Sequence, residues 1–369
     1  MSAGSRKLVG LAALVAGGIA AGVIAERAAV SRRLRGGPAL DEPFGLLRGE
    51  TVDVFAQDGV RLHVEVDEPD PARAPLSGDP AGADRAGAAL PIIFVHGYGL
   101  SQDCFHYQRA ELRGKYRLIF ADQRAHGRSG RGAPDRSTLD QLGRDLRTII
   151  DAVVPSGPVV LVGHSMGGMT ILTLAGQDPE FFRRRVVGVG LLATTSGQLF
   201  DEPFGLPVLM SRALNRVAPV ALTAAMRRQP LIEAARHQAT DLVFALTNRY
   251  SFGSPVSPTL TKFVADMVAD TPVDVIAEYL GTLQVFNRSE AVAVLEGIET
   301  LIMVGDRDRV TPLPHSIEIV RRAPHAEFVL LPDTGHMLML ERFAEVNRHL
   351  HYLLDRVGAG LAARAGDES

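Results

Sequence analysis

Short apolar runs alternate with helical patterns along most of this chain. Residues 51–56 and 62–66 alternate apolar and polar side chains around Gln57-Asp58-Gly59, which predicts a β-hairpin with an Asp-Gly turn. Later apolar runs, typical of buried strands, lie at residues 92–95, 118–121, 159–162, 186–192, 300–304 and 327–331. Helical spacing between them, as over residues 139–153, predicts βαβ units and a mostly parallel, doubly wound sheet with helices on both faces.

The alternation stops between residues 196 and 296. Four stretches with helical spacing, separated by prolines, lie at residues 210–217, 233–248, 259–269 and 273–286. We expect a helical insertion that covers the edge of the sheet where ligands bind. Apolar side chains in this insertion either line a pocket or simply pack the cap; they are Phe252, Val256, Phe263, Met267, Leu283 and Phe286.

These patterns divide the chain into five parts. Residues 1–50 form a hydrophobic N-terminal segment and linker, and residues 51–195 form the first part of the core. The helical cap covers residues 196–296, the second part of the core covers 297–357, and residues 358–369 form a frayed tail. A chain of 369 residues suits one large domain with an insertion, or two smaller domains, and 46% hydrophobic content is ample for a substantial core.

Residues 8–25 form an uncharged apolar run that is just long enough to span a bilayer as a helix. Three interpretations remain open: a single membrane anchor, a signal peptide cut after residue 25, or a soluble or surface-lying helix. We predict association with a membrane through residues 8–25, with secretion after signal cleavage as the alternative.

Charge and cysteine content exclude several classes of site. The chain has 39 basic and 42 acidic residues, so a basic surface for nucleic acid is not indicated. The single cysteine, Cys104, excludes an intramolecular disulfide and a cysteine-rich metal site. The histidines lack the spacing of metal ligands, so we expect no metal.

Candidate chemistry centres on Gly163-His164-Ser165-Met166-Gly167, which lies between an apolar run and a helical pattern. This is the G-x-S-x-G pattern in the strand–turn–helix setting of a nucleophile elbow. The two glycines allow a turn so tight that a Cβ at either position would clash. We expect Ser165 to have a strained backbone and the Met166 N–H to point to where an oxyanion forms.

A serine nucleophile needs a base and an acid that orients the base. Among 11 histidines, His336 follows the last predicted strand and lies at the same sheet edge as Ser165. Asp308 follows the preceding strand, and the order Ser165, Asp308, His336 is the one expected for hydrolase sheets. Asp306 is the rival acid, but it comes directly after its strand and is better placed to cap the turn.

From about residue 51 to residue 357, the chain resembles the α/β-hydrolase superfamily. The matching stretches are His96-Gly97-Tyr98-Gly99, residues 122–129, GHSMGG at 163–168, GDRDRVTP at 305–312 and DTGH at 333–336. The resemblance implies an α/β-hydrolase fold with a helical cap. Ala125 replaces the glycine usual in the second stretch, and we expect no catalytic consequence.

The resemblance also implies roles for individual residues. Ser165 is the expected nucleophile, His336 the general acid/base and Asp308 its orienting partner. The backbone N–H groups of Tyr98 and Met166 are the expected oxyanion hole. This machinery requires no metal or organic cofactor.

The function that follows is a serine hydrolase, esterase- or lipase-like, that cleaves carboxylic esters through an acyl-enzyme. The substrate is a small-molecule or lipid ester. Three alternatives remain: a cofactor-free perhydrolase of the haloperoxidase type, a C–C bond hydrolase, and a non-catalytic small-molecule binding protein on the same fold.

Overall fold

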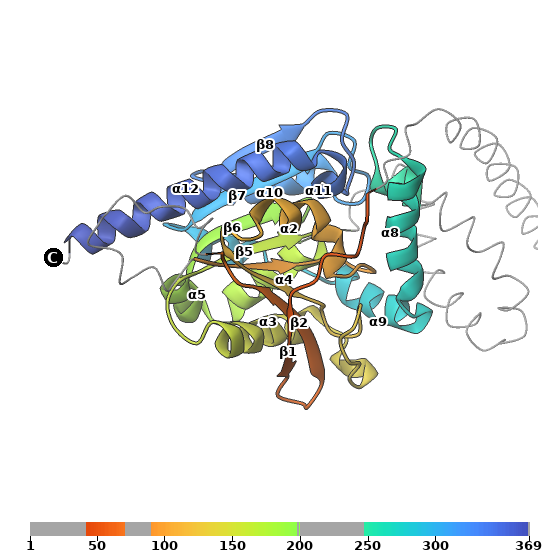
Figure 1. Cartoon of the computed structure of the whole chain (residues 1–369), viewed down its shortest axis with the longest axis horizontal. Coiled ribbons are helices and arrows are strands. Elements are labelled where there is room, and N and C mark those ends of the chain that lie inside the picture. Colours follow the sequence, from red (N-terminus) through yellow and green to blue (C-terminus); the bar gives the residue numbers. More distant parts are fainter. Residues whose placement is uncertain (1–41, 71–89, 198, 200–246, 368–369) are drawn as a thin grey trace, which may run out of the picture.

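The computed structural model describes residues 42–70, 90–197, 199 and 247–367, which fold around one eight-stranded sheet (Figure 1). The strand order is β1-β2-β4-β3-β5-β6-β7-β8. The strands are β1 (Glu50–Phe55), β2 (Arg61–Asp67), β3 (Pro91–Val95), β4 (Arg117–Ala121), β5 (Val159–His164), β6 (Val186–Leu192), β7 (Glu299–Gly305) and β8 (Glu327–Leu331).

Strand pairing confirms the predicted topology. β1 and β2 form the expected antiparallel hairpin, and β2 also pairs antiparallel with β4. All other neighbours are parallel, so the carboxyl ends of β3 to β8 lie along one edge. The mostly parallel α/β-hydrolase fold is therefore present, with β5 near the centre of the sheet.

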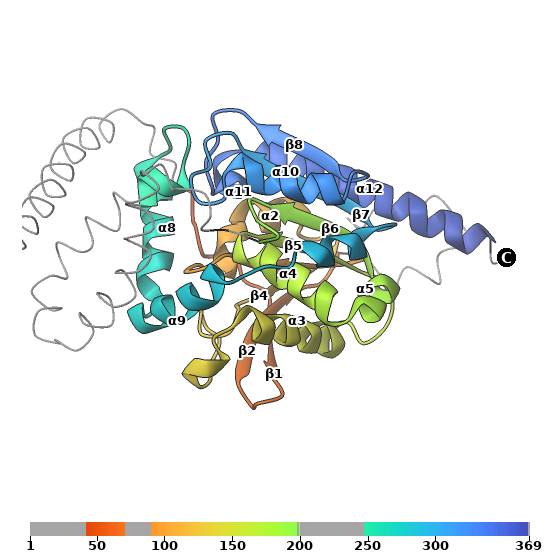
Figure 2. The ribbon, with the colours of Figure 1, turned by 180° about the vertical axis from the view of Figure 1, so that it is seen from behind.

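Helices cover both faces of the sheet (Figures 1 and 2). The longer helices are α2 (His106–Leu112), α3 (Leu139–Val153), α4 (Met166–Gln177), α5 (Pro179–Arg185), α8 (Pro258–Asp270), α9 (Val273–Gln284), α10 (Leu313–Arg322) and α12 (Phe343–Asp367). Shorter helical segments are η2 (Gln102–Phe105), η3 (Pro134–Arg136), η4 (Ser289–Leu295) and α11 (Leu338–Glu341).

Side chains of the central strands alternate between two separate hydrophobic cores, one on each face of the sheet. In β3, Ile93 and Val95 pack in the cluster that contains residues of α3, α4, α5, η4 and α10. Ile92 and Phe94 point to the other face and pack with residues of α2, α11 and α12. Both faces are buried because each strand of a parallel sheet lies between two layers of helices. Cys104 is fully buried in the second core.

The described part of the predicted cap contains helices α8 and α9 (Figure 2). The predicted stretch 210–217 lies outside the described residues, as does nearly all of 233–248. All six candidate pocket residues are packed in hydrophobic clusters: Phe252, Met267, Leu283 and Phe286 are buried, and Val256 and Phe263 are partly buried. Segment η4, assigned to the cap, packs instead in the core shared with α4.

The prediction of a frayed tail from residue 358 is wrong. Helix α12 continues to Asp367. Leu354 and Val357 are buried and Leu361 packs against the same core, so the apolar stripe of this helix extends one turn beyond the predicted boundary.

The predicted membrane segment 8–25 lies outside the described residues. None of the helices within 42–70, 90–197 and 247–367 is both long and apolar enough to cross a bilayer.

Candidate active site

Ser165 lies in a sharp turn between β5 and α4, as the elbow pattern predicts. Its backbone has φ 52° and ψ −118°, a conformation that residues other than glycine rarely adopt. The turn is held by its own backbone: Ser165 N–H donates to the Leu192 carbonyl at 2.9 Å. The Ser165 carbonyl accepts from Gly168 N–H at 2.9 Å and from the Thr194 hydroxyl at 2.7 Å. Such strain persists only where surrounding contacts over-determine the conformation.

The glycines of the elbow are required by close backbone contacts. A Cβ on Gly163 would lie 2.6 Å from backbone atoms of Gly167 and Gly168, which confirms the clash predicted for this turn. A Cβ on Gly167 would lie 1.9 Å from the Val95 carbonyl oxygen. The elbow therefore packs directly onto the end of β3, and no side chain fits between them.

Asp308 and His336 form a buried pair. His336 Nδ1 lies 2.9 Å from Asp308 Oδ2, and the residues are 8% and 5% exposed. Asp308 also accepts from the Thr311 hydroxyl at 2.9 Å and from the N–H groups of Val310 and Thr311 at 2.8 and 2.9 Å. A carboxylate oxygen accepts, so the contact with Oδ2 orients His336 with the Nδ1 proton towards Asp308 and Nε2 away from it.

Asp306 has a different role in the structure. Its carboxylate accepts from Thr334 N–H at 3.2 Å, and its own N–H donates to the Leu331 carbonyl. Asp306 is exposed, whereas Asp308 is buried against the ring of His336. The structure therefore pairs Asp308 with the histidine and uses Asp306 to brace the loop.

His164, the residue before the serine, joins the elbow to the loop of His336. Its Nε2 donates to the His336 carbonyl at 3.0 Å, and the two rings lie 4.7 Å apart. Burial keeps the pKa of His164 well below its usual range, so the ring is neutral. Among the described residues, no hydrogen bond joins the Ser165 hydroxyl to His336. Such catalytic bonds are often long in unliganded enzymes and shorten when substrate binds.

The two N–H groups predicted for an oxyanion hole lie on segments that contact each other. A Cβ on Gly97 would lie 3.1 Å from Ser165 Cβ, so the loop that carries Tyr98 runs beside the serine. Met166 is the first residue of α4, where helical N–H groups have no partner within the helix. Within the described residues, neither the Tyr98 nor the Met166 N–H has an acceptor.

A buried network fixes the loop of Tyr98, and the sequence did not reveal its members Gln123 and Thr170. His96 Nδ1 donates to the Gly97 carbonyl at 2.7 Å, and its Nε2 accepts from Gln123 N–H at 2.9 Å. The Gln123 side chain donates to the His96 carbonyl at 2.6 Å and accepts from the Thr170 hydroxyl at 2.8 Å. Burial lowers the pKa of His96 to about 4, so His96 serves as a neutral brace.

Helix α9 packs over this edge of the sheet. The Tyr98 hydroxyl donates a hydrogen bond to the Ile276 carbonyl, and the Tyr279 hydroxyl donates one to the Arg124 carbonyl. Leu283 is buried in the same apolar cluster as Met166. The cap helix thus packs against both segments that carry the N–H groups predicted for an oxyanion hole.

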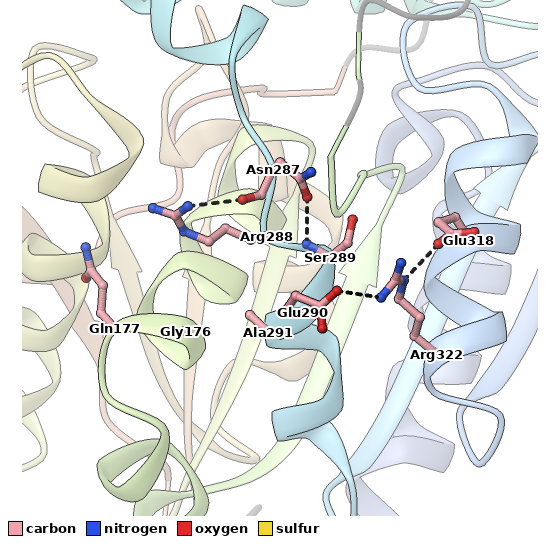
Figure 3. Close-up of a pocket in the computed structure, with 9 residues that line it drawn as sticks. All are labelled: Gly176, Gln177, Asn287, Arg288, Ser289, Glu290, Ala291, Glu318 and Arg322. Atoms are coloured by element: carbon pink, nitrogen blue, oxygen red, sulfur yellow. Dashed lines mark hydrogen bonds and ion pairs between the residues drawn. The ribbon is translucent and has the colours of Figure 1, made fainter.

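A cavity of about 590 Å³ lies at the other end of α4 (Figure 3). Its lining includes Gly176 and Gln177, so it is roughly 16 Å along the helix from Ser165. Arg322 is paired there with Glu318 and Glu290. This polar cavity is separate from the elbow. Across the described residues, no three His, Cys, Asp or Glu side chains group closely enough to hold a metal ion.

Comparison with known proteins decides the family. A model of the alpha/beta hydrolase family matches residues 92–349. This chain is an α/β hydrolase. A thermophilic esterase from Thermogutta terrifontis has the same fold, with a TM-score of 0.61 and 21% identity over 84% of this chain and 99% of that one.

The α/β hydrolase also has curated relatives of several activities. It is 26% identical over 266 residues to the dihydrolipoyllysine-residue acetyltransferase component of an acetoin cleaving system from Pseudomonas putida (70% of this chain), and spans 62% of that protein. It is 28% identical over 254 residues to an sn-1-specific diacylglycerol lipase from Mus musculus, covering 68% and 76% of the chains. A non-heme haloperoxidase from Rhodococcus erythropolis is 25% identical over 269 residues, covering 72% and 92%.

Proposed function

We propose that this α/β hydrolase is a serine hydrolase that cleaves carboxylic esters through an acyl-enzyme. The observation that carries the proposal is the buried Asp308–His336 pair, with Nδ1 and Oδ2 2.9 Å apart, beside a strained serine elbow. A carboxylate that holds a histidine ring in one orientation is what a serine nucleophile requires of the base that removes its proton.

In the proposed reaction, His336 Nε2 takes the Ser165 proton as Oγ attacks the ester carbonyl. The N–H groups of Tyr98 and Met166 stabilise the tetrahedral oxyanion, and each such donor is worth about 3 kcal/mol. The C–O bond to the alcohol then breaks, and His336 returns the proton to the leaving oxygen. Water attacks the acyl-enzyme with His336 again as the base, which releases the acid and restores Ser165.

The proposed substrate is a small-molecule or lipid ester. An esterase among the solved structures and a diacylglycerol lipase among the relatives support this class. A lipase activity would rise with acyl length, and a preference for short acyl chains would indicate an esterase.

Hydrolysis of p-nitrophenyl acetate and butyrate tests the proposal, with Ser165→Ala as the comparison. We expect turnover by the wild-type protein and its loss in the variant, because no other side chain replaces the nucleophile. Equal rates in both proteins would contradict the proposal. Binding of an ester without turnover would instead favour a non-catalytic role.

The non-heme haloperoxidase relative favours one alternative, a cofactor-free perhydrolase. In that reaction hydrogen peroxide replaces water in attack on the acyl-enzyme, and a peroxy acid is released. Formation of peracetic acid from acetate ester and peroxide, faster than hydrolysis of the ester, would establish it.

Membrane association through residues 8–25 remains a prediction. Fractionation of cells that express the full chain or a version without residues 1–35 tests it. We expect the full chain with the membranes and the shortened chain, still active, in the soluble fraction. Both forms in the soluble fraction would contradict the prediction.

A further inference from the structure

His336 is flanked on both sides by contacts with one segment that follows the part of the cap outside the described residues. This return segment is Ser251–Ser254, which precedes α8. Met337 N–H, directly after His336, donates to the Ser251 carbonyl at 2.8 Å. Gly335, directly before His336, packs closely against Gly253: a Cβ added to Gly335 would lie 2.5 Å from Gly253 N.

Glu341, the last residue of α11, joins the return segment to the loop of His336. Its carboxylate accepts from Gly335 N–H at 2.7 Å. The same carboxylate accepts from Gly253 N–H at 3.1 Å, and from the N–H and hydroxyl of Ser254, both at 2.6 Å. Four donors from two distant segments therefore converge on one side chain.

The chemistry of this cluster requires a carboxylate. Every donor that reaches Glu341 is an N–H or O–H group, and an ionised carboxylate is the side chain that only accepts. No Lys or Arg in the described ranges forms an ion pair with Glu341, so the polar contacts of its carboxylate there are these four donors. A glutamine offers one oxygen and an NH2 group, which would face N–H groups that need an acceptor.

We propose that Glu341 is a positioning residue for His336, and that through it the return segment Ser251–Ser254 sets the place of the base. This inference rests on the proposed function, in which His336 is the base. Gly335 is fixed to Glu341 on one side of His336 and Met337 to Ser251 on the other. A shift of the return segment therefore moves the imidazole relative to Ser165, and displacements of 1 Å have large effects on catalysis.

Glu341→Gln tests the proposal, with Glu345→Gln as the matched control. Glu345 lies four residues further along the chain, in α12, and its side chain has no hydrogen bond or ion pair with other described residues. The probe is an alkyl fluorophosphonate: the Ser165 oxygen forms a bond to phosphorus, fluoride leaves and His336 takes the proton. The extent of labelling gives the fraction of folded sites. The rate constant of labelling measures how reactive Ser165 is in each folded site.

For Glu341→Gln we expect full labelling with a rate constant about 10- to 100-fold lower, because the base is misplaced. kcat for p-nitrophenyl acetate should fall by a similar factor while KM changes little. The control should match the wild type. A lower extent of labelling with an unchanged rate constant would show a purely structural role and overturn the proposal.

A second variant keeps the test decisive if Glu341→Gln does not fold. Ser254→Ala removes one donor of the four, and we expect a rate constant about threefold lower. An unchanged rate constant in Ser254→Ala, with Glu341→Gln unfolded, would overturn the proposal. Failure of the wild-type protein to label at Ser165 would instead overturn the proposed function, so the two failures are distinguishable.

Discussion

Ser165 is held mostly by backbone contacts with residues 159–194, whereas the loop of His336 is held by side chains from two separate parts of the chain, residues 308–311 and Glu341. Around Ser165, the contacts are backbone carbonyl and N–H groups, the Thr194 hydroxyl, and glycines that lack a Cβ. Asp308 and Thr311 contact the ring of His336, and Glu341 accepts from the neighbouring Gly335 N–H. The nucleophile is thus fixed by one local turn, and the base by long-range packing. Substitutions should therefore damage the two regions in different ways: at the elbow through stability, and near the base through activity.

The largest expected effect is on activity, at the base. Asp308→Asn should lower kcat by about 10³- to 10⁴-fold, since an amide no longer holds the proton on His336 Nδ1. Asp306→Asn is the control and should change kcat little, because the hydrogen bonds of Asp306 with other described residues are to the loop backbone. Steady-state hydrolysis of p-nitrophenyl acetate measures both. The reverse ranking of the two variants would move the acid to Asp306.

The next effect is on stability, at the elbow. Gly167→Ala places a methyl group at the 1.9 Å contact with the Val95 carbonyl, where backbone must move. We expect a loss of about 3 kcal/mol or more in the free energy of unfolding in urea. Gly358→Ala, with no atom within 4 Å of its added Cβ, is the control and should be neutral or slightly stabilising. Equal stability of both variants would mean that the elbow accommodates a methyl group at residue 167, contrary to the contact in the structure.

A third effect links both regions to pH through the buried histidines. Burial lowers the pKa of His96 to about 4, from 6.5 in the unfolded chain. The unfolded state therefore binds more protons as the pH falls from about 6.5 towards about 4, and stability falls by up to about 1.4 kcal/mol per pH unit for this residue. His126 and His164 have pKa values lowered in the same direction. Urea unfolding at pH 7 and pH 5 measures the change, and equal stability at both values would contradict it.

The smallest effect concerns the one departure from the family pattern. Ala125 has φ 64°, in the left-handed region that favours glycine. Ala125→Gly should remove this strain and stabilise the fold by about 0.5 kcal/mol, after the entropy of the glycine is subtracted. Ala133→Gly, at φ −65° and exposed, should instead destabilise it slightly. Thermal unfolding of the two variants compares them, and a lower Tm for Ala125→Gly would show that the lost methyl contact outweighs the strain.

The elbow could be predicted from sequence in detail because its determinants lie within nine residues, 159–167. The pairing of Asp308 with His336 followed from strand order, since both residues follow neighbouring strands. The roles of Gln123 and Glu341 could not be predicted, because their partners lie far away in the chain and carry no local pattern. The end of α12 was missed for a related reason: Leu361 is apolar in sequence, but its burial depends on the packing of the core.

The hydrogen bonds of residues 251–254 also have a consequence for protein engineering. A chimera that exchanges caps between members of this family would normally be joined at the end of β6 and at the start of β7. Such a graft would discard Ser251, the partner of Met337, and also Gly253 and Ser254, the partners of Glu341, together with the old cap. The recipient should therefore keep its own residues 251–254, and the junction should be placed upstream of Ser251.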